Sequence, residues 1–280
     1  SYADGISEPR GGGVDQPLTL PSARLVSNRI AAGGGIKEST GINNLFWAWG
    51  QFIDHDIDLT DESHDEKFDI PVPADDPKFA DDLATLPFRR SANTGGSSKN
   101  PRQHRNVPTA FMDGSQVYGS EEGLAASLRV GGDGCLLQTS TGHLLKWNPS
   151  APRGGDFVAG DTRVSENPAL TSLHVLFLRE HNRLAEQFLA EGMEEETCYQ
   201  LTRLLVGAEM QLITINEFLP KLVGSSKKQK FGKKKTKVGV FTEFSTVCFR
   251  FGHSLVPNAL SLRDKNFCKI ESLSLEDAFH

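Results

Sequence analysis

One short segment concentrates ionisable side chains among large apolar residues. It reads Trp49-Gly50-Gln51-Phe52-Ile53-Asp54-His55-Asp56-Ile57-Asp58. In a helix, Gln51 and His55 project from the same face, while Asp54 and Asp56 point about 100° away on either side. Burying so many polar groups costs free energy that a purely structural helix has no reason to bear. The pattern therefore predicts a charged or polarisable ligand beside a helix over residues 41–58.

Three further motifs carry polar residues in compact patterns. A loop reads Thr109-Ala110-Phe111-Met112-Asp113-Gly114-Ser115, with oxygen ligands at alternate positions. A hard cation with six to eight oxygen ligands needs that spacing from a short loop, and a solvent-exposed Asx turn is the structural alternative. Two later segments combine glycine with arginine or histidine. They read Gly160-Asp161-Thr162-Arg163-Val164-Ser165-Glu166-Asn167-Pro168 and Phe249-Arg250-Phe251-Gly252-His253.

Taken together, these four motifs resemble the animal-type haem peroxidase family. They occur in the family's order, and the likeness spans roughly residues 20–280. The resemblance implies a mainly α fold, a helical domain with long loops and little β structure. It also implies haem b and calcium as cofactors, hydrogen peroxide as the oxidant, and halides or small organic molecules as electron donors.

The resemblance assigns a role to each charged motif residue. His55 is expected to be the base that takes a proton from peroxide and returns it to the leaving oxygen. Gln51 is expected to orient water, peroxide or halide beside it. Arg163 would stabilise negative charge as the O–O bond breaks. His253 would be the axial ligand of the haem iron, with Arg250 in the same cofactor-binding motif.

Two carboxylates resemble those that form ester bonds to haem methyl groups in this family. They are Asp54 and Glu166, and a plain hydrogen-bonding role is the alternative for each. Some members of the family carry a methionine after the second carboxylate, which forms a third, sulfonium link. This chain has Asn167 there, so we expect that link to be absent.

The same resemblance assigns calcium to the loop at residues 109–115. The implied ligands are Thr109, the Phe111 carbonyl, Asp113 and Ser115, with Asp56 reaching across from the helix. The ion would then tether this helix and fix the placement of His55.

Composition excludes some classes of function. Lys and Arg number 30 against 36 Asp and Glu, for a net charge of −6, and a nucleic-acid binder would usually be basic. No apolar run approaches the ~18 residues of a transmembrane helix. The chain shows no signal-peptide pattern, so an extracellular location is implied by the family alone.

The motifs and the chain length together predict the domain organisation. We expect an irregular N-terminal arm over residues 1–40, with glycine runs as breakers, followed by a haem peroxidase domain over residues 41–280. Only 27 residues follow His253, whereas family domains continue well beyond the proximal histidine. The sequence therefore predicts a C-terminally truncated domain, a fragment that holds its N-terminal and central parts.

Apolar spacing predicts two long helices. Asn167 is expected to cap the first, with Pro168 at its first position. The second is expected over residues 197–218, with an apolar side formed by Leu201, Leu204, Leu205, Ala208, Leu212 and Ile215. His174 and His181, on the first helix, lack metal-binding spacing and are interpreted as structural.

The remaining segments give weaker signals. We expect a hairpin over residues 132–146 and a long loop over residues 59–108. A basic run at residues 227–237 is interpreted as a solvated loop. The cysteines, Cys135, Cys198, Cys248 and Cys268, form no C-x-x-C unit and allow three pairings, so buried thiols acting as small hydrophobes are the favoured interpretation.

Three alternatives to a peroxidase stay open at this point. A fatty-acid dioxygenase of the cyclooxygenase-related type would need a tyrosine three residues before the proximal histidine, where this chain has Arg250. A divalent-metal phosphohydrolase could use His55 and Asp56, but the other histidines lack supporting spacing. A truncated, non-catalytic module for adhesion or partner binding is the third.

Overall fold

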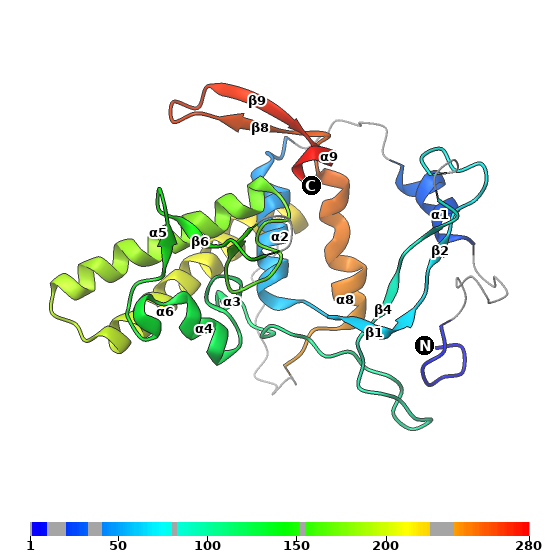
Figure 1. Ribbon diagram of the computed structural model, residues 1–280, viewed down its shortest axis with the longest axis horizontal. Coiled ribbons are helices and arrows are strands. Elements are labelled where there is room, and N and C mark those ends of the chain that lie inside the picture. Colours follow the sequence, from blue (N-terminus) through cyan, green and yellow to red (C-terminus); the bar gives the residue numbers. More distant parts are fainter. Residues whose placement is uncertain are drawn as a thin grey trace. The chain divides into compact units, whose positions relative to one another are not determined.

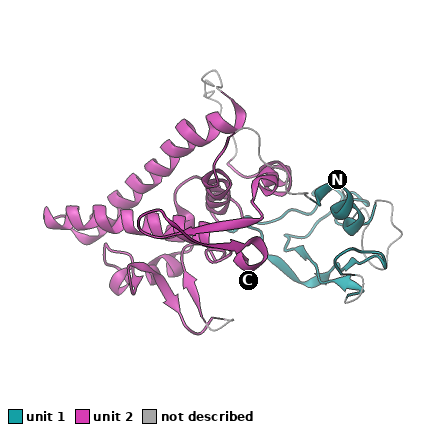
Figure 2. Ribbon diagram, turned by 90° about the horizontal axis from the view of Figure 1, so that it is seen from above, with its two compact units in different colours: residues 1–37, 59–107 teal, residues 38–58, 108–280 magenta. Residues whose placement is uncertain are grey.

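The computed structural model describes residues 2–9, 21–32, 41–79, 83–151, 155–224 and 238–279. The chain divides into two compact units, shown in Figure 2. One consists of Ser1–Lys37 and Leu59–Val107, and the other of Glu38–Asp58 and Pro108–His280. Every site residue named from the sequence lies in the second unit. The basic run at residues 227–237 and His280 both lie outside the described residues.

The first unit has more regular structure than its sequence indicates. Helix α1 (Ala23–Val26) runs into a π-helix, η1 (Ser27–Ala31), within the arm expected to be irregular. The expected loop contains two antiparallel ladders, β1 (Glu62–Lys67) with β4 (Arg89–Ser91) and β2 (Ile70–Pro71) with β3 (Thr85–Leu86).

Polar contacts stabilise this first unit. The carboxylate of Asp76 is buried and accepts hydrogen bonds from Arg24 at 2.8 and 2.9 Å and from Asn28 at 2.9 Å. These contacts fasten the helical segment to the chain that follows β2. Because polar contacts stabilise this unit, its short strands lack the alternating apolar pattern that would mark them in the sequence. The segment was therefore predicted to be a loop.

The second unit is mainly helical (Figure 1). Its principal helices are α2 (Leu45–Ile57), α5 (Pro168–Ala190) and α6 (Glu195–Ile213). The shorter ones are α3 (Ser115–Tyr118), α4 (Glu122–Leu128), η2 (Val130–Gly132), η4 (Thr214–Phe218), α7 (Leu219–Val223), α8 (Thr242–Thr246), η5 (Cys248–Leu255) and α9 (Leu275–Ala278). The mainly α fold expected from the family is confirmed. No helix in the described part of the chain is both long and apolar enough to span a membrane.

Two small sheets complete the unit. Strands β5 (Thr139–Ser140), β6 (Leu144–Asn148) and β7 (Asp156–Val158) form an antiparallel sheet in that order. The β5–β6 pair forms a hairpin with Thr139 opposite Leu145, so it overlaps only the later part of the hairpin expected over residues 132–146. Strands β8 (Ala259–Arg263) and β9 (Lys269–Ser274) form a separate hairpin near the end of the chain.

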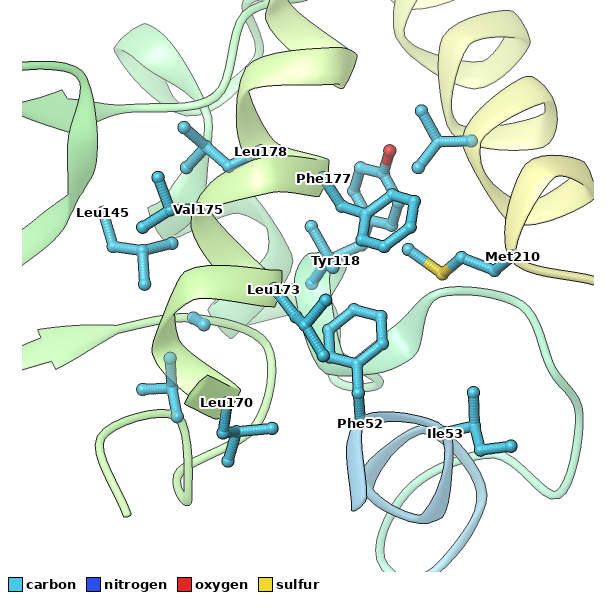
Figure 3. Packing of buried hydrophobic residues seen from close by; sticks show 14 of the residues in the cluster. Phe52, Ile53, Tyr118, Leu145, Leu170, Leu173, Val175, Phe177, Leu178 and Met210 are labelled. Atoms are coloured by element: carbon cyan, nitrogen blue, oxygen red, sulfur yellow. The ribbon is translucent and has the colours of Figure 1, made fainter. Parts of the chain in front are cut away.

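Helix α5 begins as the sequence predicts. The Asn167 side chain accepts a hydrogen bond from the Leu170 N–H at 3.0 Å, and Pro168 occupies the first turn. The helix then packs its apolar side against α2. The Phe52 and Phe177 rings stack 5.3 Å apart in the centre of the core, as Figure 3 shows. This contact fixes the face that α2 turns away from the core.

The apolar side expected for α6 is not the side that this helix buries. Leu204, Leu212 and Ile215 are 68, 58 and 56% exposed. The buried side instead carries less uniformly apolar residues, namely Cys198, Tyr199, Thr202, Val206, Gly207 and Met210. Disulfide bonding, aromatic contacts and close packing against α5 select this side, and a count of leucines detects none of these interactions.

The cysteines also differ from expectation. Cys135 and Cys198 form a buried disulfide with their Cα atoms 5.9 Å apart, while Cys248 and Cys268 are free and exposed. The disulfide ties the segment after η2 to the first turns of α6. Its two residues are separated by 63 positions, so no local spacing in the sequence marks the pair.

The disulfide yields a test of stability. A cross-link that closes a loop of this length should contribute about 4 kcal/mol by restricting the unfolded chain. We expect the double variant Cys135→Ala/Cys198→Ala to lose most of that free energy of unfolding in urea titrations. The matched variant Cys248→Ala/Cys268→Ala removes exposed thiols and should unfold like the parent. Equal midpoints for the two variants would show that the cross-link adds nothing.

Candidate active site

A single cavity of about 300 Å³ in the second unit gathers the predicted residues. Helix α2, the turn before α5 and η5 form its walls, and α2 packs directly against η5. The residues expected to do chemistry or hold a cofactor there are Gln51, Asp54, His55, Arg163, Glu166, Arg250 and His253, and all seven line it. Segments far apart in the sequence therefore meet at one place.

His55 is buried on α2, and its side chain is neutral at physiological pH. Its Nδ1 atom lies 3.6 Å from Asp161 Oδ1, beyond hydrogen-bond distance. Burial, together with the nearby charge of Arg163, lowers the pKa of His55 to about 3, against an opposing effect of Asp161. A neutral imidazole in this cavity can accept a proton.

Arg163 is held in place by Asp161, a residue that the sequence reasoning did not single out. Its Nε and Nη2 atoms donate to the two Asp161 carboxylate oxygens at 2.9 and 2.7 Å. The same Nη2 donates to the Asp58 carbonyl at 2.8 Å. Burial acts to raise the pKa of Asp161, but the hydrogen bonds and charge of Arg163 outweigh it and hold the pKa below its usual value. The spacing Asp-x-Arg is the signal that could have identified this pair.

Gln51 has its side-chain amide fixed at both ends. Its Nε2 donates to Glu166 Oε2 at 2.7 Å, and its Oε1 accepts from Asn167 Nδ2 at 2.9 Å. Asn167 therefore both caps α5, as the sequence predicted, and orients Gln51, which the sequence did not indicate. Burial raises the pKa of Glu166, with Arg163 opposing it.

Arg250 contacts two carboxylates, one within α2 and one at the C-terminal end of that helix. Its Nη1 lies 2.9 Å from Asp54 Oδ2, and its Nη2 lies 3.2 Å from Asp58 Oδ2. Burial raises the pKa of Asp54 to about 6, although the charge of Arg250 acts against it. The other Asp54 oxygen, Oδ1, is buried without a hydrogen-bond partner among the described residues. Asp58 was not among the predicted site residues.

His253 lies on η5 with an exposed side chain that lines the cavity. Beside it, a Cβ atom placed on Gly252 would meet no atom within 4 Å. The glycine thus borders open space rather than a packed neighbour.

The predicted calcium residues also come together. Asp56 is fully buried, and its Oδ1 accepts hydrogen bonds from the Ser115 N–H at 2.6 Å and the Ser115 hydroxyl at 2.9 Å. The Thr109 hydroxyl donates to Asp113 at 3.0 Å and to the Phe111 carbonyl at 3.3 Å. Burial raises the pKa of Asp56 to about 7. No group of three or more His, Cys, Asp or Glu among the described residues is arranged to hold a metal, and this set has only two carboxylates.

These features occur in a chain that belongs to a known family. The family model described as animal haem peroxidase matches residues 1–280, so the chain is a member of that family. It is 34% identical to thyroid peroxidase of Canis lupus familiaris, over 100% of this chain and 36% of that protein. It is also 33% identical to lactoperoxidase of Mesocricetus auratus, over 95% of this chain and 44% of that protein. The chain thus spans less than half the length of these relatives.

Solved structures show the same fold. Peroxidase A from Dictyostelium discoideum superposes with a TM-score of 0.77 at 25% identity, over 94% of this chain and 57% of that one. A fatty acid alpha-dioxygenase from Oryza sativa superposes with a TM-score of 0.72 at 22% identity, over 92% of this chain and 48% of that one. At that identity the second likeness shows the fold alone.

The turn that carries Arg163 requires a glycine at position 160. A Cβ on Gly160 would collide with the backbone of Gly119 and Ser115, and neither atom can move alone. We expect Gly160→Ala to lower the free energy of unfolding by about 1–3 kcal/mol, as overpacking does. Gly123→Ala is the matched control, because nothing lies within 4 Å of that position in α4. Urea unfolding curves measure both, and an unperturbed Gly160→Ala variant would contradict the packing argument.

His174 predicts a pH dependence of stability. It is fully buried on α5, neither ring nitrogen has a hydrogen-bond partner among the described residues, and burial lowers its pKa to about 4. The unfolded chain takes up this proton near pH 6.5, so stability falls as pH falls below that value.

The variant His174→Leu removes this titration. Between pH 7 and pH 5 it should lose about 2 kcal/mol less stability than the parent chain. His64→Leu, at an exposed position, should follow the parent. Parallel stability curves for the parent and His174→Leu would show that His174 does not titrate as inferred.

Proposed function

We propose that this chain is the haem-binding part of a peroxidase that reduces hydrogen peroxide and oxidises halides or small organic donors. One observation carries the proposal. His55 on α2 and His253 on η5 line the same cavity, together with the permanent cation Arg163. A base, an axial nitrogen ligand and a positive charge are the groups that peroxide reduction at a haem requires.

The cavity fits a haem by its donors and its open space. Open space lies beside Gly252, and Asp54 Oδ1 is a buried acceptor without a donor among the described residues. We assign His253 as the axial ligand and Asp54 and Glu166 as carboxylates that would form ester bonds to haem b. A bound haem would supply the two-electron reduction of peroxide, and halides or small organic donors would return it to its resting state.

The chain's own residues would position and move the proton. Neutral His55 would take the proton from the bound oxygen and return it to the leaving oxygen. Gln51, fixed by Glu166 and Asn167, would orient peroxide, water or halide without rotating. The guanidinium of Arg163, anchored by Asp161, would stabilise negative charge during O–O cleavage, and removing such a group costs a factor of about 10²–10³ in rate.

The ester assignment has a consequence for charge. An ester at Asp54 would remove the carboxylate with which Arg250 now pairs and leave Asp58 as the partner of that guanidinium. With Asn167 in place of methionine, a sulfonium link would be absent. Two further parts of the proposal rest on the family. One is secretion of the whole protein, and the other is a calcium ion bound by Asp56, Thr109, Phe111, Asp113 and Ser115.

A second candidate function is a non-catalytic module of peroxidase descent. Haem binding separates the two, because an adhesion module has no need of an axial ligand. A fatty-acid dioxygenase activity is disfavoured by Arg250, which stands where that chemistry would place a tyrosine.

Haem titration of the 280-residue chain tests the proposal. We expect saturable binding with the spectrum of a histidine-ligated haem. His253→Ala should lose that spectrum, and added imidazole should restore it in part. Gly252→Val should fill the open space and weaken haem binding about tenfold or more while the haem-free chain unfolds as before. His64→Ala is the control at an exposed histidine, and a His253→Ala spectrum identical to that of the parent would remove the axial assignment.

Chelation tests the calcium assignment. A metal that binds only the folded state stabilises it by about 2.7 kcal/mol at one hundred times its dissociation constant. We therefore expect added calcium to raise the melting temperature and a chelator to lower it. Asp113→Asn should abolish the difference, whereas Asp65→Asn, at an exposed position in the first unit, should preserve it. If calcium does not change the melting temperature of the parent chain, residues 109–115 form an ordinary turn without a bound ion.

A further inference from the structure

A tyrosine and a histidine form a hydrogen-bonded pair in the core, away from the residues that line the cavity. The Tyr118 hydroxyl and His181 Nδ1 are 2.9 Å apart, and both side chains are completely buried. On its other side, His181 Nε2 lies 2.9 Å from the Cys135 carbonyl oxygen. None of the roles assigned to the cavity uses either residue.

The backbone carbonyl determines the protonation of this pair. A carbonyl oxygen can only accept, so His181 Nε2 must carry the ring hydrogen and donate it to Cys135. Nδ1 is then the unprotonated nitrogen of a neutral ring, and the Tyr118 O–H must donate to it. Burial lowers the pKa of His181 to about 4, which keeps the ring neutral. The Tyr118 hydroxyl therefore donates its proton in a hydrogen bond to the unprotonated, basic Nδ1 of His181.

This geometry suits loss of an electron. A phenol that gives up an electron becomes a strong acid, and at a fully buried position its proton needs an acceptor within hydrogen-bond distance. Tyr118 has that acceptor. Tyr199 packs edge-on against Tyr118 with ring centroids 6.1 Å apart, but its hydroxyl has no proton acceptor among the described residues. Of the two buried tyrosines, only Tyr118 is equipped to release a proton and an electron together.

Helix α2 connects the cavity to the buried cluster that contains Tyr118. Helix α2 lines the cavity through Gln51 and His55 and turns Phe52 into the core, where it stacks on Phe177. Tyr118, Phe177 and Phe52 belong to the same buried cluster, in which Figure 3 labels all three. The Gln116 amide also donates to the Phe52 carbonyl at 3.2 Å, so the turn that carries Tyr118 touches α2 directly.

We propose that Tyr118 and His181 form an internal redox pair that donates one electron to an oxidised haem in the cavity, with the phenolic proton passing to His181 Nδ1. The step breaks the Tyr118 O–H bond and forms an N–H bond at Nδ1. It leaves a neutral tyrosyl radical and an imidazolium, and it lowers the oxidation level of the haem by one electron. Return of an electron from a small donor reverses the proton transfer. The inference rests on the proposed function for its oxidant, which is a haem oxidised by hydrogen peroxide.

The small number of tyrosines makes the pair testable. The sequence contains Tyr2, Tyr118 and Tyr199 and no other tyrosine. The double variant Tyr2→Phe/Tyr199→Phe therefore leaves Tyr118 alone, and ring-deuterated tyrosine identifies any radical on it by narrowing its electron paramagnetic resonance signal. The full chain is oxidised in two ways: haem-free, with a photogenerated ruthenium(III) complex, and haem-loaded, with hydrogen peroxide.

We expect a deuterium-sensitive tyrosyl signal from the double variant in both experiments. Tyr118→Phe in the parent chain should lose this signal. His181→Gln keeps a hydrogen-bond acceptor but cannot hold the proton, so its signal should fall about tenfold or more with the far-ultraviolet circular dichroism unchanged. If either of these variants does not fold, the deuterated double variant decides alone.

The two experiments separate the possible failures. No tyrosyl signal from the haem-free double variant would overturn the redox pair, and an undiminished signal in a folded His181→Gln variant would do the same. A haem that is oxidised by peroxide without any Tyr118 radical would also overturn it. A signal in the haem-free chain together with a haem that does not react with peroxide would instead refute the proposed function and leave the pair as a redox centre.

Discussion

The carboxylate of Asp56 is the contact on which the placement of α2 depends. It is fully buried and accepts hydrogen bonds from the Gly114 and Ser115 backbone N–H groups and from the Ser115 hydroxyl, while no cation from the described residues pairs with it. A buried carboxylate that accepts three hydrogen bonds is costly to displace, because these bonds would be lost at a position without access to solvent. Asp56 therefore fixes the rotation of α2 about its axis. Once that rotation is set, the helix must present His55 and Gln51 to the cavity and Phe52 to the core.

Around the cavity, burial and charge move neighbouring groups in opposite directions. Burial lowers the pKa of His55 to about 3 and raises that of Asp54 to about 6, while Arg163 keeps Asp161 ionised. Two guanidinium groups and several carboxylates are interleaved, so no wall of the cavity carries an unopposed charge. Such a site keeps its base neutral and its cations fixed without a change of conformation.

The sequence predicted the parts of the structure that depend on local patterns. The motif at Asp54-His55-Asp56 indicated a helix with polar residues on several sides, and Asn167 with Pro168 indicated the start of α5. The sequence failed where partners come from distant segments. Nothing near Cys135 indicates Cys198, and nothing near Asp58 indicates Arg250. The buried side of α6 could not be identified from its leucines either, because Leu204 and Leu212 are exposed and its packing residues are chemically mixed.

Asn167 performs two mechanical tasks with one amide. Its oxygen caps the first turn of α5, and its nitrogen holds the Gln51 side chain. A methionine at this position, as some members of the family have, offers neither a donor nor an acceptor of comparable strength. The position can therefore serve as a polar clasp between two helices or as a sulfur ligand to a cofactor edge, but not as both. A lineage that exchanges one residue for the other must find a new way to cap α5 and a new partner for Gln51 at the same time.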